Sequence, residues 1–167
     1  MDNYIVLNGK KHDLTDEQVA AITAAGITFA RNNPFERARD GLYYLPATNG
    51  EITQLHDSGS VFDKNIYAMC NGFNDAAFAK QVQLHQLLYR RLLKFAYDNG
   101  LEDTSPAFGP DACGRYYVVR VGTEVTVGCT SVTKIPGVVY FATEDGAQRA
   151  VREVVQPFLA DHPGFEW

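Results

Sequence analysis

The sequence lacks the short motifs that would identify a reaction. It contains no GxGxxG, no GxxxxGKS or GxxxxGKT, and no glycine-rich turn from a strand into a helix, which excludes these phosphate-binding loops. It has no CxxC pair, and Cys70, Cys113 and Cys129 do not have the spacing of a zinc site. Three cysteines without such a pattern indicate buried free thiols in a reducing compartment. We therefore expect neither a metal nor a cofactor.

Long hydrophobic runs and strong positive charge are missing as well. No stretch approaches the roughly 18 apolar residues of a membrane-spanning helix, and the first residues, MDNYIVLNGKK, lack the order of a signal peptide. A net charge of −5 gives no electrostatic support for duplex binding. The 167 residues, 46% of them apolar and 12% aromatic, suffice for a packed core. These properties predict a cytoplasmic protein of about one domain with no membrane partner.

The longest regular pattern lies between Asp75 and Asn99. This stretch contains no proline or glycine, Asp75 is suited to cap its start, and Gly100 is suited to end it. On a helix, one half collects the residues that we predict to be buried: Phe78, Val82, His85, Leu88, Tyr89, Leu92, Leu93 and Ala96. The other half carries Lys80, Gln83, Gln86, Arg90, Arg91 and Lys94. His85 is expected to be a hydrogen-bonded core histidine rather than a metal ligand.

Residues 1–40 predict a hairpin, a helix and a connector. Strand-like residues flank Asn8-Gly9, the pair best suited to a type I′ turn. Thr15 and Gln18 have the spacing of a capping box at the start of a short helix. This segment can dock as a separate N-terminal element.

A β-β-β-α pattern occurs twice after residue 40. Residues 41–100 contain a hairpin, a third strand at Ile66–Met69 and the long helix. Residues 115–167 contain a second hairpin, a third strand at Val138–Phe141, a helix and an aromatic tail. Residues 101–114 are rich in glycine and proline and form a linker. We predict an α+β fold of antiparallel sheets from two similar β-β-β-α units around a long central helix, together one compact domain.

The junctions between strand and helix share one register. The spacing is the same in both copies: Phe73, Asp75 and Ala79 in the first, and Phe141, Thr143 and Ala147 in the second. A duplication would explain this, and so would the independent need of such junctions for a cap and small packing residues. We expect Pro157 to end the second helix.

The polar half of the long helix is the strongest interaction feature of the sequence. We predict a partner-binding surface made of Lys80, Leu87, Arg90, Arg91 and Lys94. The alternative is a solvated helix face with one stray leucine. A second use of the same cations, together with the paired tyrosines of the two hairpins, is the binding of single-stranded nucleic acid.

Catalytic side chains do not gather in the sequence. His56, Asp57 and Ser58 are the residue types of a hydrolase triad, but three consecutive residues do not make one. The other carboxylates are scattered, and Glu144 and Asp145 are explained by the first turn of a helix. We assign no catalytic residue, and a small-molecule-binding or enzymatic domain with a pocket between the two units remains an alternative.

The motifs of this chain resemble those of an uncharacterised family of phage and prophage accessory proteins. The matching residues are Asn33-Pro34-Phe35-Glu36-Arg37, Gly41, Tyr43, Tyr44, Asp63, Tyr67, Asn71, Phe73, and Tyr140-Phe141-Ala142-Thr143-Glu144-Asp145-Gly146-Ala147. The resemblance covers roughly residues 15 to 158, and Gly146 departs from it where a second acidic residue is usual. It implies a mobile-element protein expressed in a bacterial cytoplasm, and it supplies no catalytic residues.

Together these observations favour a non-enzymatic accessory protein that acts by binding a host protein. The resemblance suggests that inhibition of a host defence protein is one such role. Nucleic-acid binding through the basic helix face and a ligand-binding or enzymatic domain are the alternatives.

Overall fold

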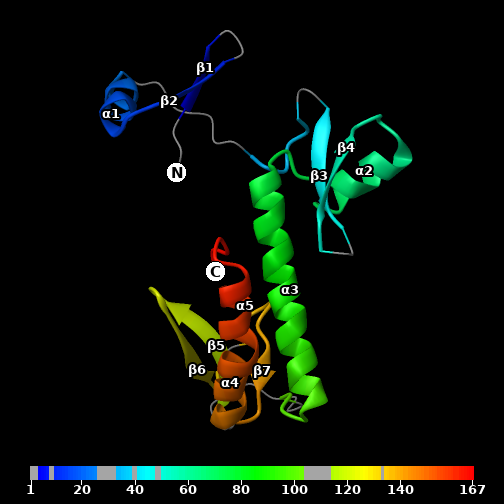
Figure 1. Ribbon diagram of the computed structural model, residues 1–167, viewed down its shortest axis with the longest axis vertical. Coiled ribbons are helices and arrows are strands. Elements are labelled where there is room, and N and C mark those ends of the chain that lie inside the picture. The colour runs from blue at the N-terminus through cyan, green and yellow to red at the C-terminus, as the bar shows by residue number, and fades with distance from the viewer. Residues whose placement is uncertain are drawn as a thin grey trace. The chain divides into compact units, whose positions relative to one another are not determined.

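The structure is a computed structural model, and it is a mixed α+β fold with small antiparallel sheets (Figure 1). It describes residues 4–7, 10–25, 33–38, 41–47, 50–103, 114–132 and 134–167. The chain divides into two compact units, Met1–Asn33 and Pro34–Trp167. The first unit ends before the predicted boundary at residue 40, because the backbone and side chain of Asn74 bind the carbonyls of Pro34 and Glu36.

The first unit is a hairpin followed by a helix. Strands β1 (Tyr4–Leu7) and β2 (Lys10–Asp13) pair antiparallel, which confirms the predicted hairpin; its turn residues lie outside the described residues. Helix α1 (Asp16–Ala24) begins at the predicted capping box. The Thr15 backbone N–H donates to the Gln18 side-chain oxygen at 2.9 Å, and the Gln18 N–H donates to the Thr15 hydroxyl at 3.3 Å.

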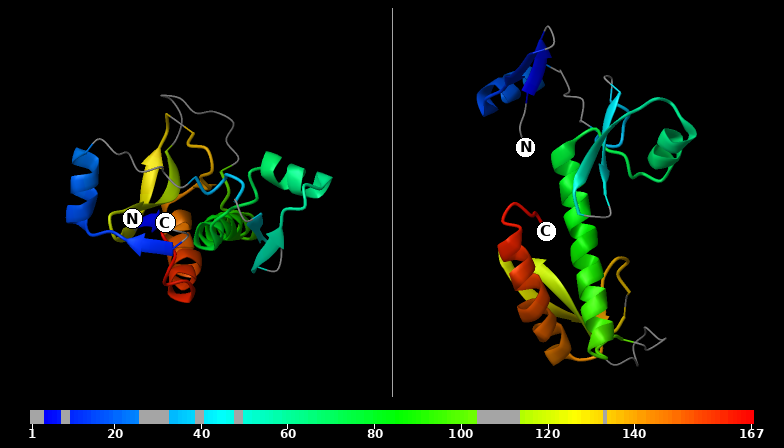
Figure 2. Two further views of the ribbon diagram at one scale, coloured as in Figure 1. Left: turned by 90° about the horizontal axis from the view of Figure 1, so that it is seen from above. Right: turned by 45° about the vertical axis from the view of Figure 1, so that its right-hand side comes forward.

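The second unit contains two sheets and the long helix. Strands β3 (Leu42–Pro46) and β4 (Ile52–His56) form one hairpin. The other sheet has the order β6-β5-β7, with bounds β5 (Arg115–Val121), β6 (Glu124–Thr130) and β7 (Tyr140–Phe141). The long helix α3 (Ala76–Asp98) contacts the β3–β4 hairpin and the C-terminal helices. In the right-hand view of Figure 2 the C-terminal helices lie along the lower half of α3.

The predicted third strand at Ile66–Met69 is wrong, because residues 61–68 form helix α2 (Val61–Ala68). Ser60 caps this helix: its hydroxyl accepts from the Asp63 N–H at 3.2 Å, while the Asp63 carboxylate accepts from the Ser60 N–H at 3.0 Å. Such a reciprocal cap stabilises the first helical turn and outweighs the strand preference of Ile66 and Tyr67.

The core lies between the C-terminal part of α3 and the second sheet with its helices. Its buried members are Leu84, Leu88, Leu92, Ala96, Val139, Phe141, Ala147, Ala150, Val155, Phe158 and Phe165. Three predictions for α3 are wrong. Tyr89, which we predict to be buried, is 39% exposed. His85 is exposed and makes an edge-to-face contact with the ring of Phe165, with 4.7 Å between centroids. Gln83 is 4% exposed, because its side-chain amide donates to the carbonyls of Ala47 and Glu51.

The C-terminal helix continues beyond Pro157, contrary to the prediction. It consists of α4 (Glu144–Ala150), a π-helical segment η1 (Val151–Val155) and α5 (Gln156–Asp161). In a regular α-helix the ring of Pro157 would collide with the carbonyl of residue 153, and the wider π turn relieves this conflict. The aromatic tail folds back, with Phe165 buried in the core and Trp167 packed against it.

The predicted burial of the cysteines is wrong for two of the three residues, although both are free thiols as predicted. Cys70 and Cys129 are free and exposed, and Cys113 lies outside the described residues. Cys70 has a φ of +52°, in the left-handed region that ends a helix, and this turns its side chain outward.

Candidate functional site

Helix α2 is held against the β3–β4 hairpin by one buried carboxylate. Asp63 is 3% exposed and is the one buried residue of α2, a helix that the structure describes throughout. Its carboxylate accepts hydrogen bonds from the Tyr43 hydroxyl at 2.8 Å, from the backbone N–H groups of Ser58 and Ser60 at 3.0 Å, and from their hydroxyls at 2.8 and 2.7 Å. Tyr43 itself is fully buried. We call this set, Tyr43, Ser58, Ser60 and Asp63, the Asp63 network.

The Asp63 network stabilises the ionised form of its carboxylate. Hydrogen bonds from the Ser60, Ser58 and Tyr43 side chains hold the pKa of Asp63 well below its usual range, although burial acts in the opposite direction. A carboxylate that remains ionised far below neutral pH is unsuited to general acid–base catalysis near pH 7. The network is therefore suited to positioning α2.

The pKa of Tyr43 is raised to about 12. Burial of the phenol is the largest cause, and the hydrogen bond to Asp63 is the second. We expect an absorbance titration of phenolate at 295 nm to show a tyrosine that ionises near this pH and disappears in Tyr43→Phe. A raised pKa contributes stability below the unfolded value of about 10, and this contribution is lost as the pH rises towards the folded value. Wild type and Tyr43→Phe with the same titration above pH 11 would contradict the network.

A second polar group borders the network. The Arg37 guanidinium lies over the ring of Tyr67, 4.7 Å from its centroid, and its Nε is 3.4 Å from a carboxylate oxygen of Asp57. The Tyr67 hydroxyl is buried and has no hydrogen-bond partner among the described residues. Asp57 pairs with Arg37 and Ser58 with Asp63, so these two residues of the His56-Asp57-Ser58 trio are engaged by groups outside it.

Large apolar side chains are exposed on α2 and at its C-cap, Met69. Val61 is 73% exposed, Phe62 54% and Met69 77%. At about 100° per residue, Phe62 and Met69 project within about 20° of each other, with Val61 about 100° or less away. We call these three residues the α2 apolar face. Because Asp63 anchors the helix from its inner side, the fold does not require these side chains to be buried.

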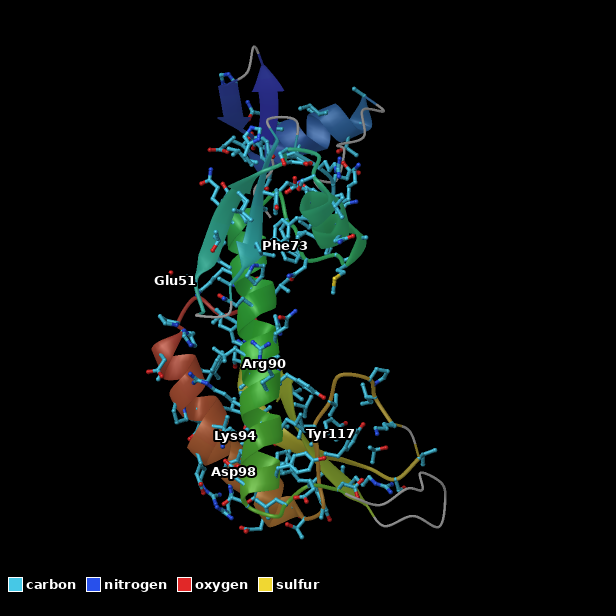
Figure 3. All side chains as sticks on the ribbon, turned by 90° about the vertical axis from the view of Figure 1, so that its right-hand side faces the viewer. Glu51, Phe73, Arg90, Lys94, Asp98 and Tyr117 are labelled. Carbon is cyan, nitrogen blue, oxygen red and sulfur yellow. The ribbon has the colours of Figure 1, made fainter. Side chains whose placement is uncertain are left out.

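The predicted basic surface is divided between several local roles. Lys80 donates to the carbonyl of Gly50 and to the Gln83 side chain, both at 3.3 Å. Leu87 is half-buried and packs against the core. Arg91 lies over the Phe158 ring at 5.3 Å, and Lys94 forms an ion pair with Asp98. Figure 3 shows Arg90, Lys94 and Asp98 in succession along α3.

Two shallow hollows lie on the second unit. One, of about 270 Å³, lies between α3 and the η1–α5 region and is bordered by Arg91, Lys94, Asp98 and Glu153 among others. The other, of about 250 Å³, lies between β6 and the α4–η1 helix. Both are smaller than the roughly 300–1,000 Å³ of typical small-molecule sites. Within the described ranges, no three His, Cys, Asp or Glu side chains gather as metal ligands.

The Asp63 network and the α2 apolar face were not predicted from the sequence. The available signal was Ser60-x-x-Asp63, which has the spacing of a capping box and would have placed a helix here. For the part of the chain that the structure describes, no helix has the length and hydrophobicity of a membrane span. Comparisons with protein-family models, curated proteins and solved structures found no match.

Proposed function

We propose that this chain is a non-enzymatic binding protein whose docking surface is the α2 apolar face. The observation that carries the proposal is the exposure of Val61 and Phe62 in the first turn of α2 and of Met69 at its C-cap, on a helix that is fixed by the buried Asp63. Large apolar side chains grouped on a surface are typical of interaction sites. A short helix with such anchors fits an apolar groove in a partner protein, with Phe62 and Met69 inserted into it.

We place this binding protein among phage or mobile-element accessory proteins, with a bacterial host protein as its partner. The support is the resemblance of the NPFER, YY and YFATED segments to that family. A component of a host defence system is the kind of partner we favour. Nucleic-acid binding has weaker support, because the ion pairs Lys94–Asp98 and Arg149–Glu153 place acidic groups beside the cations of the helices.

The test is affinity capture from a bacterial lysate by the wild type and by two matched variants. Phe62→Asp places a carboxylate in the first turn of α2, where the helix dipole tolerates it, so the fold should survive. Val132→Asp changes an equally apolar site that is 68% exposed and lies outside α2. We expect a stoichiometric protein that is captured by the wild type and Val132→Asp and lost with Phe62→Asp. No such protein, or equal capture by all three, would contradict the proposal.

We also propose that the β3–β4 and β5–β6 hairpins derive from one duplicated unit. In each, the phenylalanine before the helix pairs antiparallel with the first hairpin strand: Phe73 with Tyr44, and Phe141 with Tyr116. Both phenylalanines are at most 1% exposed. In this proposal α2 occupies the place in the first copy where the described residues of the second copy form bends and a turn at Pro136-Gly137. An experimental structure in which the two junctions do not superpose would count against it.

A further inference from the structure

Strand β6 is an edge strand whose outer backbone groups have no strand partner among the described residues. The hairpin turns at Gly122-Thr123, where Gly122 has a φ of +62°, and Val121 faces Glu124 across the turn. In a two-residue hairpin this closing pair is hydrogen-bonded, and the pairs then alternate. The N–H and C=O groups of Val125 and Val127 consequently point away from β5. The sequence of β6, EVTVGCT, contains none of the lysines or prolines that protect edges.

The hollow beside this edge carries charges of both signs in a regular order. Its lining from β6 includes Val125 and Val127, and its lining from the helix includes Glu144, Gln148 and Arg152. These three helical residues follow one another at intervals of four, so one stripe runs from negative through neutral to positive. The Gln148 amide donates to the Glu144 carboxylate at 3.2 Å, which keeps both side chains on that stripe.

We propose that the β6 edge binds a second copy of this chain and forms a two-fold symmetric dimer. Val127 lies at the two-fold axis, β6 pairs antiparallel with the partner's β6, and the two three-stranded sheets become one six-stranded sheet. An isologous contact requires a surface complementary to itself. The stripe meets this requirement, because a two-fold rotation places Glu144 opposite the partner's Arg152 and Gln148 opposite the partner's Gln148.

The residues along the strand fit the same symmetry. With Val127 central, Val125 faces the partner's Cys129 on the helix side, and Glu124 faces the partner's Thr130 on the other side. No like charges oppose each other along the strand, where such pairs would be destabilising. A strand from an unrelated protein would use the backbone groups equally well, but it would not account for the order of charges on the helix.

Sedimentation velocity over a range of concentrations tests this dimer, with circular dichroism as the control for folding. We expect the wild type to form a dimer, and Arg152→Glu to weaken it about tenfold or more by placing two carboxylates opposite each other. The double variant E144R/R152E exchanges the charges and should restore the wild-type association. Arg90→Glu, an exposed cation elsewhere on α3, should change nothing.

Two results would overturn the proposal. One is a wild-type protein that sediments as a monomer up to millimolar concentrations. The other is a dimer that Arg152→Glu weakens no more than Arg90→Glu does, since the charge stripe would then have no part in association. The α2 apolar face is a different surface, so neither result bears on host-protein binding.

Discussion

Asp63→Ala is expected to release α2 from the β3–β4 hairpin while the rest of the second unit remains folded. The change removes the acceptor of five hydrogen bonds, abolishes one half of the capping box, and leaves the buried Tyr43 hydroxyl without its acceptor. Buried polar groups without partners are costly, and α2 has no buried apolar side chain to compensate. Amide hydrogen exchange should therefore accelerate at least about tenfold in residues 61–68.

The matched control is Asp98→Ala, which removes an exposed carboxylate that pairs with Lys94. Exposed ion pairs contribute little, so exchange in α2 and in the core of α3 should be unchanged. If Asp63→Ala leaves exchange in residues 61–68 as slow as in the wild type, the Asp63 network does not hold the helix.

The stability that the Asp63 carboxylate contributes is expected to depend on pH. The pKa of Asp63 is lowered by folding, so its contribution to stability is present above the unfolded pKa of about 3.9 and is lost as the pH falls below it. The protection of α2 in the wild type should therefore decline in acid towards that of Asp63→Ala. A difference between the two proteins that stayed constant from pH 7 to strongly acidic solution would contradict this.

The second large effect is expected from Phe141→Ala. Phe141 is fully buried in the core and lies in β7, where it pairs with Tyr116. Truncating a buried phenylalanine removes its burial and leaves a cavity, so the free energy of unfolding in urea should fall by about 3–5 kcal/mol. This loss is about half of the stability of a typical domain, so Phe141→Ala is expected to destabilise the protein more than the other single substitutions.

Phe62→Ala is the matched control for Phe141→Ala. The same side chain is removed, but Phe62 is 54% exposed on the α2 apolar face. We expect a loss within about 0.5 kcal/mol, as is usual for surface substitutions. A loss comparable to that of Phe141→Ala would show that Phe62 is part of the core and would remove the main argument for a docking surface.

Features that depend on neighbouring residues could be predicted from the sequence. The predicted helix from Asp75 to Asn99 and the observed α3 differ by one residue at each end, and Asp75 accepts from the Phe78 N–H at 2.9 Å as its cap. The hairpin of β5 and β6 and the capping box of α1 are confirmed in the same way. Each is determined by a few consecutive residues, and local stereochemistry suffices to predict it.

Features that depend on tertiary contacts were missed. Gln83 is polar but buried, because the carbonyls that it binds come from the β3–β4 connection, more than thirty residues earlier in the chain. Asp63 of α2 is buried because its carboxylate accepts a hydrogen bond from Tyr43 of β3, twenty residues earlier in the chain. The periodicity of apolar residues along the sequence cannot show such a contact. The α2 apolar face was missed for a local reason: the β-prone Ile66 and Tyr67 favoured a strand, although Ser60 and Asp63 have the spacing of a capping box.

The proposed role of the α2 apolar face is contact with a partner protein, while the remainder of the second unit supports it. Site-specific photo-crosslinking in bacterial cells tests this most directly, with a photoreactive phenylalanine analogue in place of Phe62 and, as the control, in place of Val132, which is 68% exposed outside α2. We predict one discrete covalent adduct of higher mass from position 62 and none of that mass from position 132. No adduct from position 62, or the same adducts from both positions, would contradict the claim.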